Sequence, residues 1–255
     1  MALLPRSGRS DTPTLDHGQI RGLTRRWLAP WSQLIPAEQD LLVDLTEQLV
    51  DDLRWEAANG FAITDDMRVA IASHAALLVL AFDDGLDNYH DVTSIIVHPS
   101  TIVRRGEHYL GDGLFSDGHD PVIGEAHHRG PVLVSWDAAA SQARAPQYGD
   151  NVILHEFAHR LDMLDGISNG TPLLADRNEL ERWVRVCTDT LTRLRLATEP
   201  SVLSDYAATN PAEFFAVATE VFFTRPIPLR DENPQLYSVL RDYFRQDPAA
   251  RCVTT

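Results

Sequence analysis

The residues of this sequence best suited to metal chemistry are two histidines and a glutamate in the run His155-Glu156-Phe157-Ala158-His159. On a helix, residues four apart lie on the same face, one turn above each other. The two imidazoles could then bind one Zn²⁺ ion, with the Glu156 carboxylate beside them to take a proton from metal-bound water. The pattern predicts the zinc site of a hydrolase, and the alternative is a surface helix with two solvated histidines.

A catalytic zinc ion has three protein ligands and keeps a fourth position open for water, so the pattern requires one more ligand. No histidine lies near position 165, which excludes the metzincin form of the motif. Glu213 and Glu220 are the candidates, seven residues apart on one expected helix. Glu213 is also placed to form a capping box with Asn210. Glu220 could be a ligand or could accept a hydrogen bond from a zinc-bound histidine.

Two sequence blocks, residues 155–162 and 205–217, closely resemble the Mlc titration factor A family of bacterial zinc peptidases. Residues 220–223 extend the second block, and residues 130–136 are similar to the family's strand before the active-site helix. The likeness covers about residues 36–248. The second block also resembles, more distantly, the catalytic domain of anthrax lethal factor.

The resemblance implies a role for each matching residue. Glu213 becomes the third zinc ligand in a gluzincin-type site, and Glu220 supports a ligand or is structural. Tyr206, seven residues before Glu213, matches a tyrosine that donates to the developing oxyanion, a role that makes chemical sense; the alternative is a half-buried loop tyrosine. Asp162 could orient His159 or be a solvent-facing acid at the helix end.

The expected reaction is hydrolysis of a peptide or protein substrate by zinc-activated water, with Glu156 as the general base. The resemblance implies an aminopeptidase leaning, and we expect an edge strand at 132–136 to pair with the extended substrate. The family is named for sequestering a sugar-responsive transcriptional repressor, so the alternative is a regulatory binding protein with that partner. Hydrolysis of a non-peptide amide is a third interpretation.

The elements that must position these residues follow from hydrophobic periodicity and turn residues. The helix of the motif can be capped by Asp150 or Asn151, can end at Gly166, and has an apolar opposite face. Other helices are predicted over about 36–58, from Thr64 onward, and over 177–197, 211–223 and 233–245. Short β-prone runs at 93–98, 101–103, 122–123 and 132–136 predict a small mixed or antiparallel sheet.

The order helices, strands, helices predicts an α+β fold of the zincin type. We expect residues 31–255 to form a single zinc metallopeptidase domain, after a mobile N-terminal segment of residues 1–30. Three histidines, His119, His127 and His128, fall in a polar loop and could form a second metal site or a lid, or neither. His74, within an apolar helix, is expected to be a satisfied core histidine.

Composition limits the classes of partner and compartment. The formal net charge of −15 argues against nucleic acid as a partner, although residues 21–26 are rich in arginine. Cys187 and Cys252 form no disulfide framework, which favours a reducing compartment. The first thirty residues lack the apolar region of a secretory signal, and the apolar run at 69–82 is too short for a membrane span. We therefore expect a cytoplasmic protein with no membrane partner.

Overall fold

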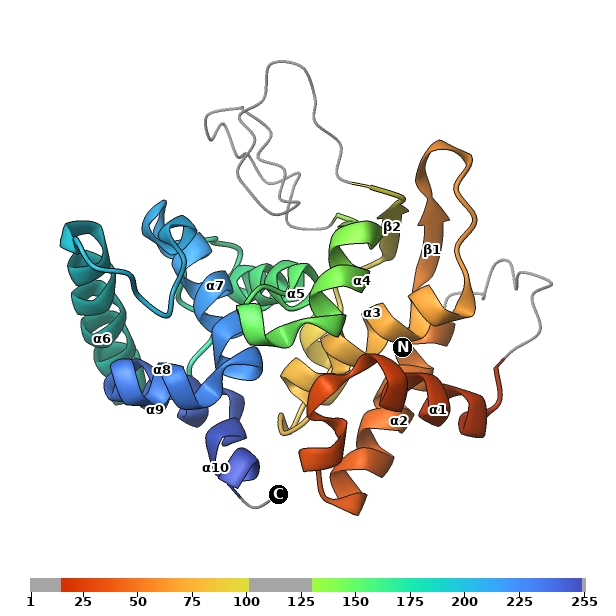
Figure 1. Ribbon diagram of the computed structural model, residues 1–255, viewed down its shortest axis with the longest axis horizontal. Coiled ribbons are helices and arrows are strands. Elements are labelled where there is room, and N and C mark those ends of the chain that lie inside the picture. The colour runs from red at the N-terminus through yellow and green to blue at the C-terminus, as the bar shows by residue number, and fades with distance from the viewer. Residues whose placement is uncertain (1–14, 101–129, 254–255) are drawn as a thin grey trace, which may run out of the picture.

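The computed structural model describes residues 15–100 and 130–253 and is mostly helical, with one small sheet (Figure 1). The strands are β1 (Arg54–Ala57), β2 (Ser94–His98) and β3 (Val132–Ser135). The helices are α1 (His17–Trp27), α2 (Pro36–Asp52), α3 (Asp65–Val79), α4 (Trp136–Arg144), α5 (Val152–Asp162), α6 (Arg177–Leu196), α7 (Pro211–Thr224), α8 (Pro226–Glu232), α9 (Pro234–Phe244) and α10 (Pro248–Val253). The α+β class is confirmed. Among the described residues, no helix is both long and apolar enough to cross a bilayer.

The sheet has the order β1-β2-β3 with all pairs parallel, so the prediction of a mixed or antiparallel sheet is wrong. The physical reason for the parallel order is the length of the connections between neighbouring strands. Helix α3 lies between β1 and β2 in the chain, and residues 99–131 separate β2 from β3, whereas antiparallel neighbours can be joined by a tight hairpin. The runs at 93–98 and 132–136 are confirmed as strands. Those at 101–103 and 122–123 lie outside the described residues.

Strand β1 replaces the last turns of a helix that we predicted to reach residue 58. Helix α2 ends at Asp52, and the indole of Trp55 donates to the carbonyl of Val50 at 3.0 Å. This bond satisfies a carbonyl in the last helical turn, where no helical donor is available. Pairing of β1 with β2 then outweighs the helical pattern of the sequence.

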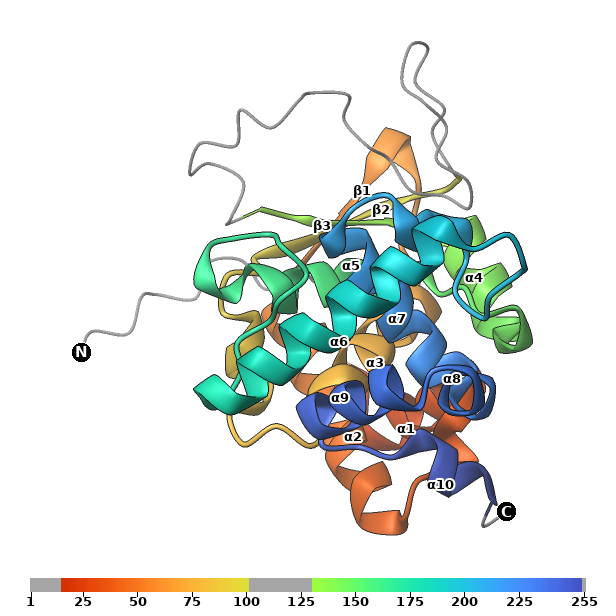
Figure 2. The same cartoon turned by 90° about the vertical axis from the view of Figure 1, so that its left-hand side faces the viewer.

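Three helices form the centre of the molecule, and α5 packs between α3 and α7. All residues of α3 from 69 to 79 and of α7 from 214 to 223 are buried, as expected of helices that are apolar all round. Trp183 of α6 packs against Phe215 of α7 and Tyr243 of α9, each with ring centroids 5.6 Å apart. Figure 2 shows the sheet across one end of this assembly, with α5 beneath it.

Helix α1, which we did not predict, lies within residues 1–30, the segment that we expected to be mobile. Asp16 caps the helix in a capping box with Gln19, and Ile20 and Trp27 are buried. Part of the arginine-rich run lies on the surface. The side chains of Arg21 and Arg26 are partly exposed and pair with acids of neighbouring helices. Residues 1–14 lie outside the described part of the chain.

Candidate metal centre

Helix α5 carries the histidine pattern, and its local sequence fixes where it begins and ends. The Asn151 side chain accepts from the backbone N–H of Leu154 at 3.1 Å, so Asn151 is the cap. A short 3-10 helix follows α5 and ends at Gly166. The φ of Gly166 is 89°, a left-handed conformation that glycine adopts without strain. Phe157 and Leu161 are buried in the core. The predicted helix and its apolar face are confirmed.

Three side chains bring one ligand atom each to a common point: His155, His159 and Glu213. The His155 Nε2 atom lies 3.0 Å from Glu213 Oε2 and 3.1 Å from His159 Nε2. The His159 Nε2 atom lies 3.4 Å from Glu213 Oε2. Ligands at about 2.0–2.1 Å from a tetrahedral zinc ion are about 3.3 Å apart, so these separations suit zinc.

The chemistry of the three groups also favours a cation. The other ring nitrogen of His155, Nδ1, lies 2.7 Å from a carboxylate oxygen of Glu220, so Nδ1 carries the proton and donates it. If the His155 ring were neutral, its Nε2 atom would therefore present a lone pair to the negatively charged Glu213 carboxylate. Burial alone would lower the pKa of His155, but Glu220 and Glu213 raise it to about 10. Positive charge is therefore stabilised where these atoms meet, and a divalent cation supplies more of it than one proton.

Glu213 lies in the first turn of α7, where Asn210 accepts from its backbone N–H at 3.0 Å. The Glu213 carboxylate contacts the two histidines. Burial would raise the pKa of Glu213, but hydrogen bonds with His155 and His159 hold it well below the usual range. Asn210 thus caps the helix, while the Glu213 carboxylate is directed to the candidate metal centre.

Glu220 lies outside the ligand triad and supports it by a hydrogen bond to Nδ1 of His155, the ring nitrogen that is not a candidate ligand. It is buried, and its second carboxylate oxygen accepts from the backbone N–H of Asn151. One side chain thus connects the cap of α5 to the ring of His155. Of the two alternatives for Glu220, the geometry favours the hydrogen-bond acceptor over the ligand.

Glu156 and Tyr206 border the triad. Burial raises the pKa of Glu156, while the two histidines act to lower it. Tyr206 lies in a 3-10 helix (Asp205–Ala208), with its ring centroid 6.0 Å from that of His155. Burial, followed by the carboxylate of Glu213, raises the pKa of Tyr206 well above its usual value, so its hydroxyl keeps its proton near neutral pH.

Asp162 is fully buried, so the alternative of a solvent-facing acid is wrong. One carboxylate oxygen accepts from the N–H of Gly170 at 2.9 Å and from the hydroxyl of Ser168 at 3.3 Å. Burial raises the Asp162 pKa, and these bonds oppose the shift. Asp162 therefore anchors the loop after α5. No hydrogen bond to His159 is found in the described residues.

Gly170 is a residue that sequence reasoning missed. Its φ is +73°, and a Cβ placed there would lie 2.1 Å from the carbonyl oxygen of Pro211. The Trp183 indole also donates to the Gly170 carbonyl at 3.0 Å. The loop is thus fixed against the first turn of α7, two residues before Glu213. Its only sequence signal is a glycine in a polar turn, which is common.

None of the other histidines in the described residues joins the triad. His74 lies beside a separate cavity, described below. The loop histidines His119, His127 and His128 lie outside the described residues, so a second metal site or a lid stays a prediction.

Comparison with known proteins gives a consistent family match. A family model described as glucose-regulated metallo-peptidase M90 matches residues 14–245. An uncharacterized protein of Synechocystis is 36% identical over 227 residues, covering 87% of this chain and 82% of that protein. Mlc titration factor A proteins of Yersinia pestis and Yersinia pseudotuberculosis are each 31% identical over 231 residues, covering 88% of this chain and 82% of each relative. The distant likeness to lethal factor stays a prediction.

Proposed function

The chain belongs to the family of glucose-regulated metallo-peptidases M90, and on that premise we propose that it is a zinc-dependent peptidase. The observation that carries the proposal is the triad of His155, His159 and Glu213, whose ligand atoms lie 3.0–3.4 Å apart. These three residues would hold the ion. A bound zinc ion polarises a carbonyl group and makes a water molecule nucleophilic near neutral pH.

The residues around the triad would divide the remaining work. Glu156 takes a proton from the attacking water and returns it to the leaving amine. Tyr206 donates a hydrogen bond to the carbonyl oxygen as negative charge develops on it. Glu220 keeps the Nδ1 proton of His155 in place, so that Nε2 remains a ligand.

Strand β3 is our candidate for the surface that aligns the substrate. It lies at the edge of the sheet and packs against α5. Within the described residues it pairs only with β2, and Leu133 on it is 45% exposed. An extended peptide could therefore add to this edge by backbone hydrogen bonds.

Comparing peptides with free and acetylated N-termini tests the aminopeptidase leaning, since an aminopeptidase cleaves only the free form.

Metal content tests the central proposal. We expect about one zinc ion per purified chain, and at least about tenfold weaker zinc binding in His155→Ala and Glu213→Ala, because each removes a ligand. Mass spectrometry and chelator competition measure both quantities. His90→Ala is the control, since His90 is exposed and its ring, within the described part of the chain, bonds only to the Asp87 carbonyl. A wild-type chain that cannot be loaded with zinc would contradict the proposal.

Tyr206→Phe tests the oxyanion role. We expect kcat to fall by about 10²–10³-fold, because one preorganised donor is lost. Zinc content and the melting temperature should stay near the wild-type values, since the ring that packs against the core is retained. Steady-state kinetics on a peptide substrate measure the effect. If kcat changes less than threefold, Tyr206 is a structural loop residue.

A regulatory binding protein is the second candidate function, because the Yersinia relatives bear the name Mlc titration factor A. A transcriptional repressor as partner would also fit the expected cytoplasmic location. The two functions separate in one comparison: repressor binding is measured for the zinc-depleted chain and for Glu156→Gln. Binding that survives both changes would show that partner recognition is independent of hydrolysis.

A further inference from the structure

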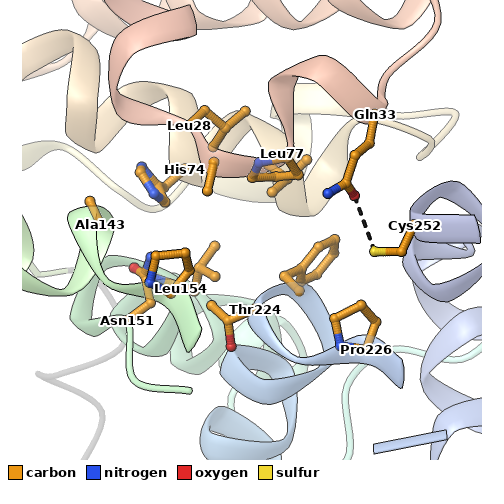
Figure 3. A pocket seen from close by; sticks show the side chains of 14 residues that line it. Leu28, Gln33, His74, Leu77, Ala143, Asn151, Leu154, Thr224, Pro226 and Cys252 are labelled. Atoms are coloured by element: carbon orange, nitrogen blue, oxygen red, sulfur yellow. Dashed lines mark hydrogen bonds between the residues drawn. The ribbon is translucent and has the colours of Figure 1, made fainter. Parts of the chain in front are cut away.

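A cavity of about 110 Å³ lies beside the first turn of α5 and the last turn of α7 (Figure 3). Its walls come from distant parts of the chain, including α3, the segment after α1, and Cys252 near the described C-terminal end. None of the triad residues, Glu156 or Tyr206 lines it. The cavity is therefore distinct from the candidate metal centre.

The lining is apolar and uncharged, with a few polar groups. Leucines, prolines, alanines and Phe223 form most of the wall, and among the described residues no Asp, Glu, Lys or Arg contributes to it. In Figure 3, His74 and Asn151 lie at one end, and Gln33 and Cys252, which share a hydrogen bond of 3.4 Å, lie at the other. Such a lining selects a neutral ligand, because a charged one would lose its hydration without a counter-charge.

His74 supplies an unused acceptor. The residue is only 3% exposed, and Nδ1 lies 2.7 Å from the Ala70 carbonyl. A carbonyl only accepts, so Nδ1 carries the proton. Burial lowers the pKa of His74 to about 4, so the ring is neutral near pH 7. Its Nε2 then presents a lone pair for which the described residues provide no donor.

Asn151 supplies an unused donor at the same end of the cavity. Its side-chain oxygen accepts from Leu154, which fixes the orientation of the amide. The NH₂ group of that amide has no acceptor within the described part of the chain. A hydroxyl group, which both donates and accepts, matches this pair of groups.

We propose that this cavity binds a small neutral molecule with a hydroxyl group on an apolar body, the hydroxyl donating to Nε2 of His74. An apolar engineered cavity of about 150 Å³ binds benzene, and this cavity of about 110 Å³ is smaller, so the ligand is limited to about a single ring, and phenol is the probe. The Asn151 amide at the same end is available to donate to the hydroxyl oxygen.

The position of the cavity gives such a ligand a route to the metal centre. The Asn151 backbone N–H donates to Glu220, and the Thr224 hydroxyl, also in the lining, donates to the Glu220 carbonyl at 2.7 Å. Glu220 in turn accepts from His155. We expect ligand and metal to change each other's affinity by the same factor. Only this coupling depends on the proposed function, and binding itself does not.

The experiment is an NMR titration of the metal-free chain with phenol, so failure of the peptidase proposal would not affect it. We expect saturable shifts at the lining residues Ala143, Leu154 and Thr224, and a change in the ¹⁵N shift of His74 Nε2. Toluene, with a methyl in place of the hydroxyl, should bind at least about fivefold more weakly, because it leaves both polar groups unpaired. Benzoate should not bind. Absence of any saturable shift with phenol would overturn the proposal.

Two variants test the assignment separately. His74→Phe keeps a ring but removes the acceptor, so phenol should lose its advantage over toluene. Ala143→Leu fills the same end of the cavity and should abolish binding of both, which keeps the test valid if His74→Phe does not fold. Undiminished phenol binding in a folded Ala143→Leu chain would place the ligand elsewhere and overturn the proposal.

Discussion

Replacing Glu156 with glutamine is expected to lower kcat for peptide hydrolysis by at least about 10³-fold while zinc content stays at the wild-type level. General-base catalysis contributes about 10²–10⁴-fold, and an amide cannot take the proton of the attacking water. Glutamine has nearly the same shape, so α5 and the ligand triad remain in place. Single-turnover kinetics and metal analysis on the same preparation measure both quantities.

A matched control is available for this substitution. Glu181 lies on the surface of α6 and pairs with Arg177 at 2.9 Å, so Glu181→Gln changes the same functional group on an exposed side chain outside the triad. We expect it to keep full activity. Turnover by Glu156→Gln at the rate of this control would disprove the base assignment.

Replacing Gly170 with alanine is expected to weaken zinc binding at least about tenfold, although Gly170 touches no ligand atom. The added Cβ would meet the Pro211 carbonyl oxygen at 2.1 Å, and backbone cannot yield as a flexible side chain does. The first turn of α7 must then move, and Glu213 moves with it. An error of about 1 Å in a supporting shell is enough to impair a metal site. Chelator competition measures the affinity.

Gly60 separates this displacement from backbone strain. Its φ of +72° nearly equals that of Gly170, but a Cβ there meets nothing within 4 Å. Gly60→Ala should therefore cost about 1–2 kcal/mol of unfolding free energy from the left-handed conformation and leave zinc affinity unchanged. Equal zinc affinities in the two variants would refute the positioning role of Gly170.

The parts of the site that depend on neighbouring residues in the sequence could be predicted. The pair of histidines, the cap of α5 and the helix of Glu213 depend on residues within one or two turns of each other. The resemblance then singled out Glu213 and Tyr206. The sequence did not determine which group Glu220 contacts, because that contact depends on how α5 and α7 cross. Gly170 was missed for the same reason, since its constraint comes from Pro211, far along the chain.

The fold divides in the same way. Helices with a strong period, such as α6 and α9, were placed within a residue or two. Strand β1 and the parallel order of the sheet were not predicted, because both depend on pairing between distant segments. Helix α1 was missed since its buried face, with Ile20 and Trp27, is short and surrounded by arginines.

The ligands on α5 and α7 are far apart in the chain, so a bound metal ion would also be a reversible cross-link. His155 and Glu213 are 58 positions apart. A permanent link closing such a loop would destabilise the unfolded chain by about 4 kcal/mol at 25 °C. A metal ion acts only while bound, and its contribution grows with free metal concentration. We therefore expect metal starvation to shorten the lifetime of the protein in proteolytic surroundings as well as to stop its chemistry.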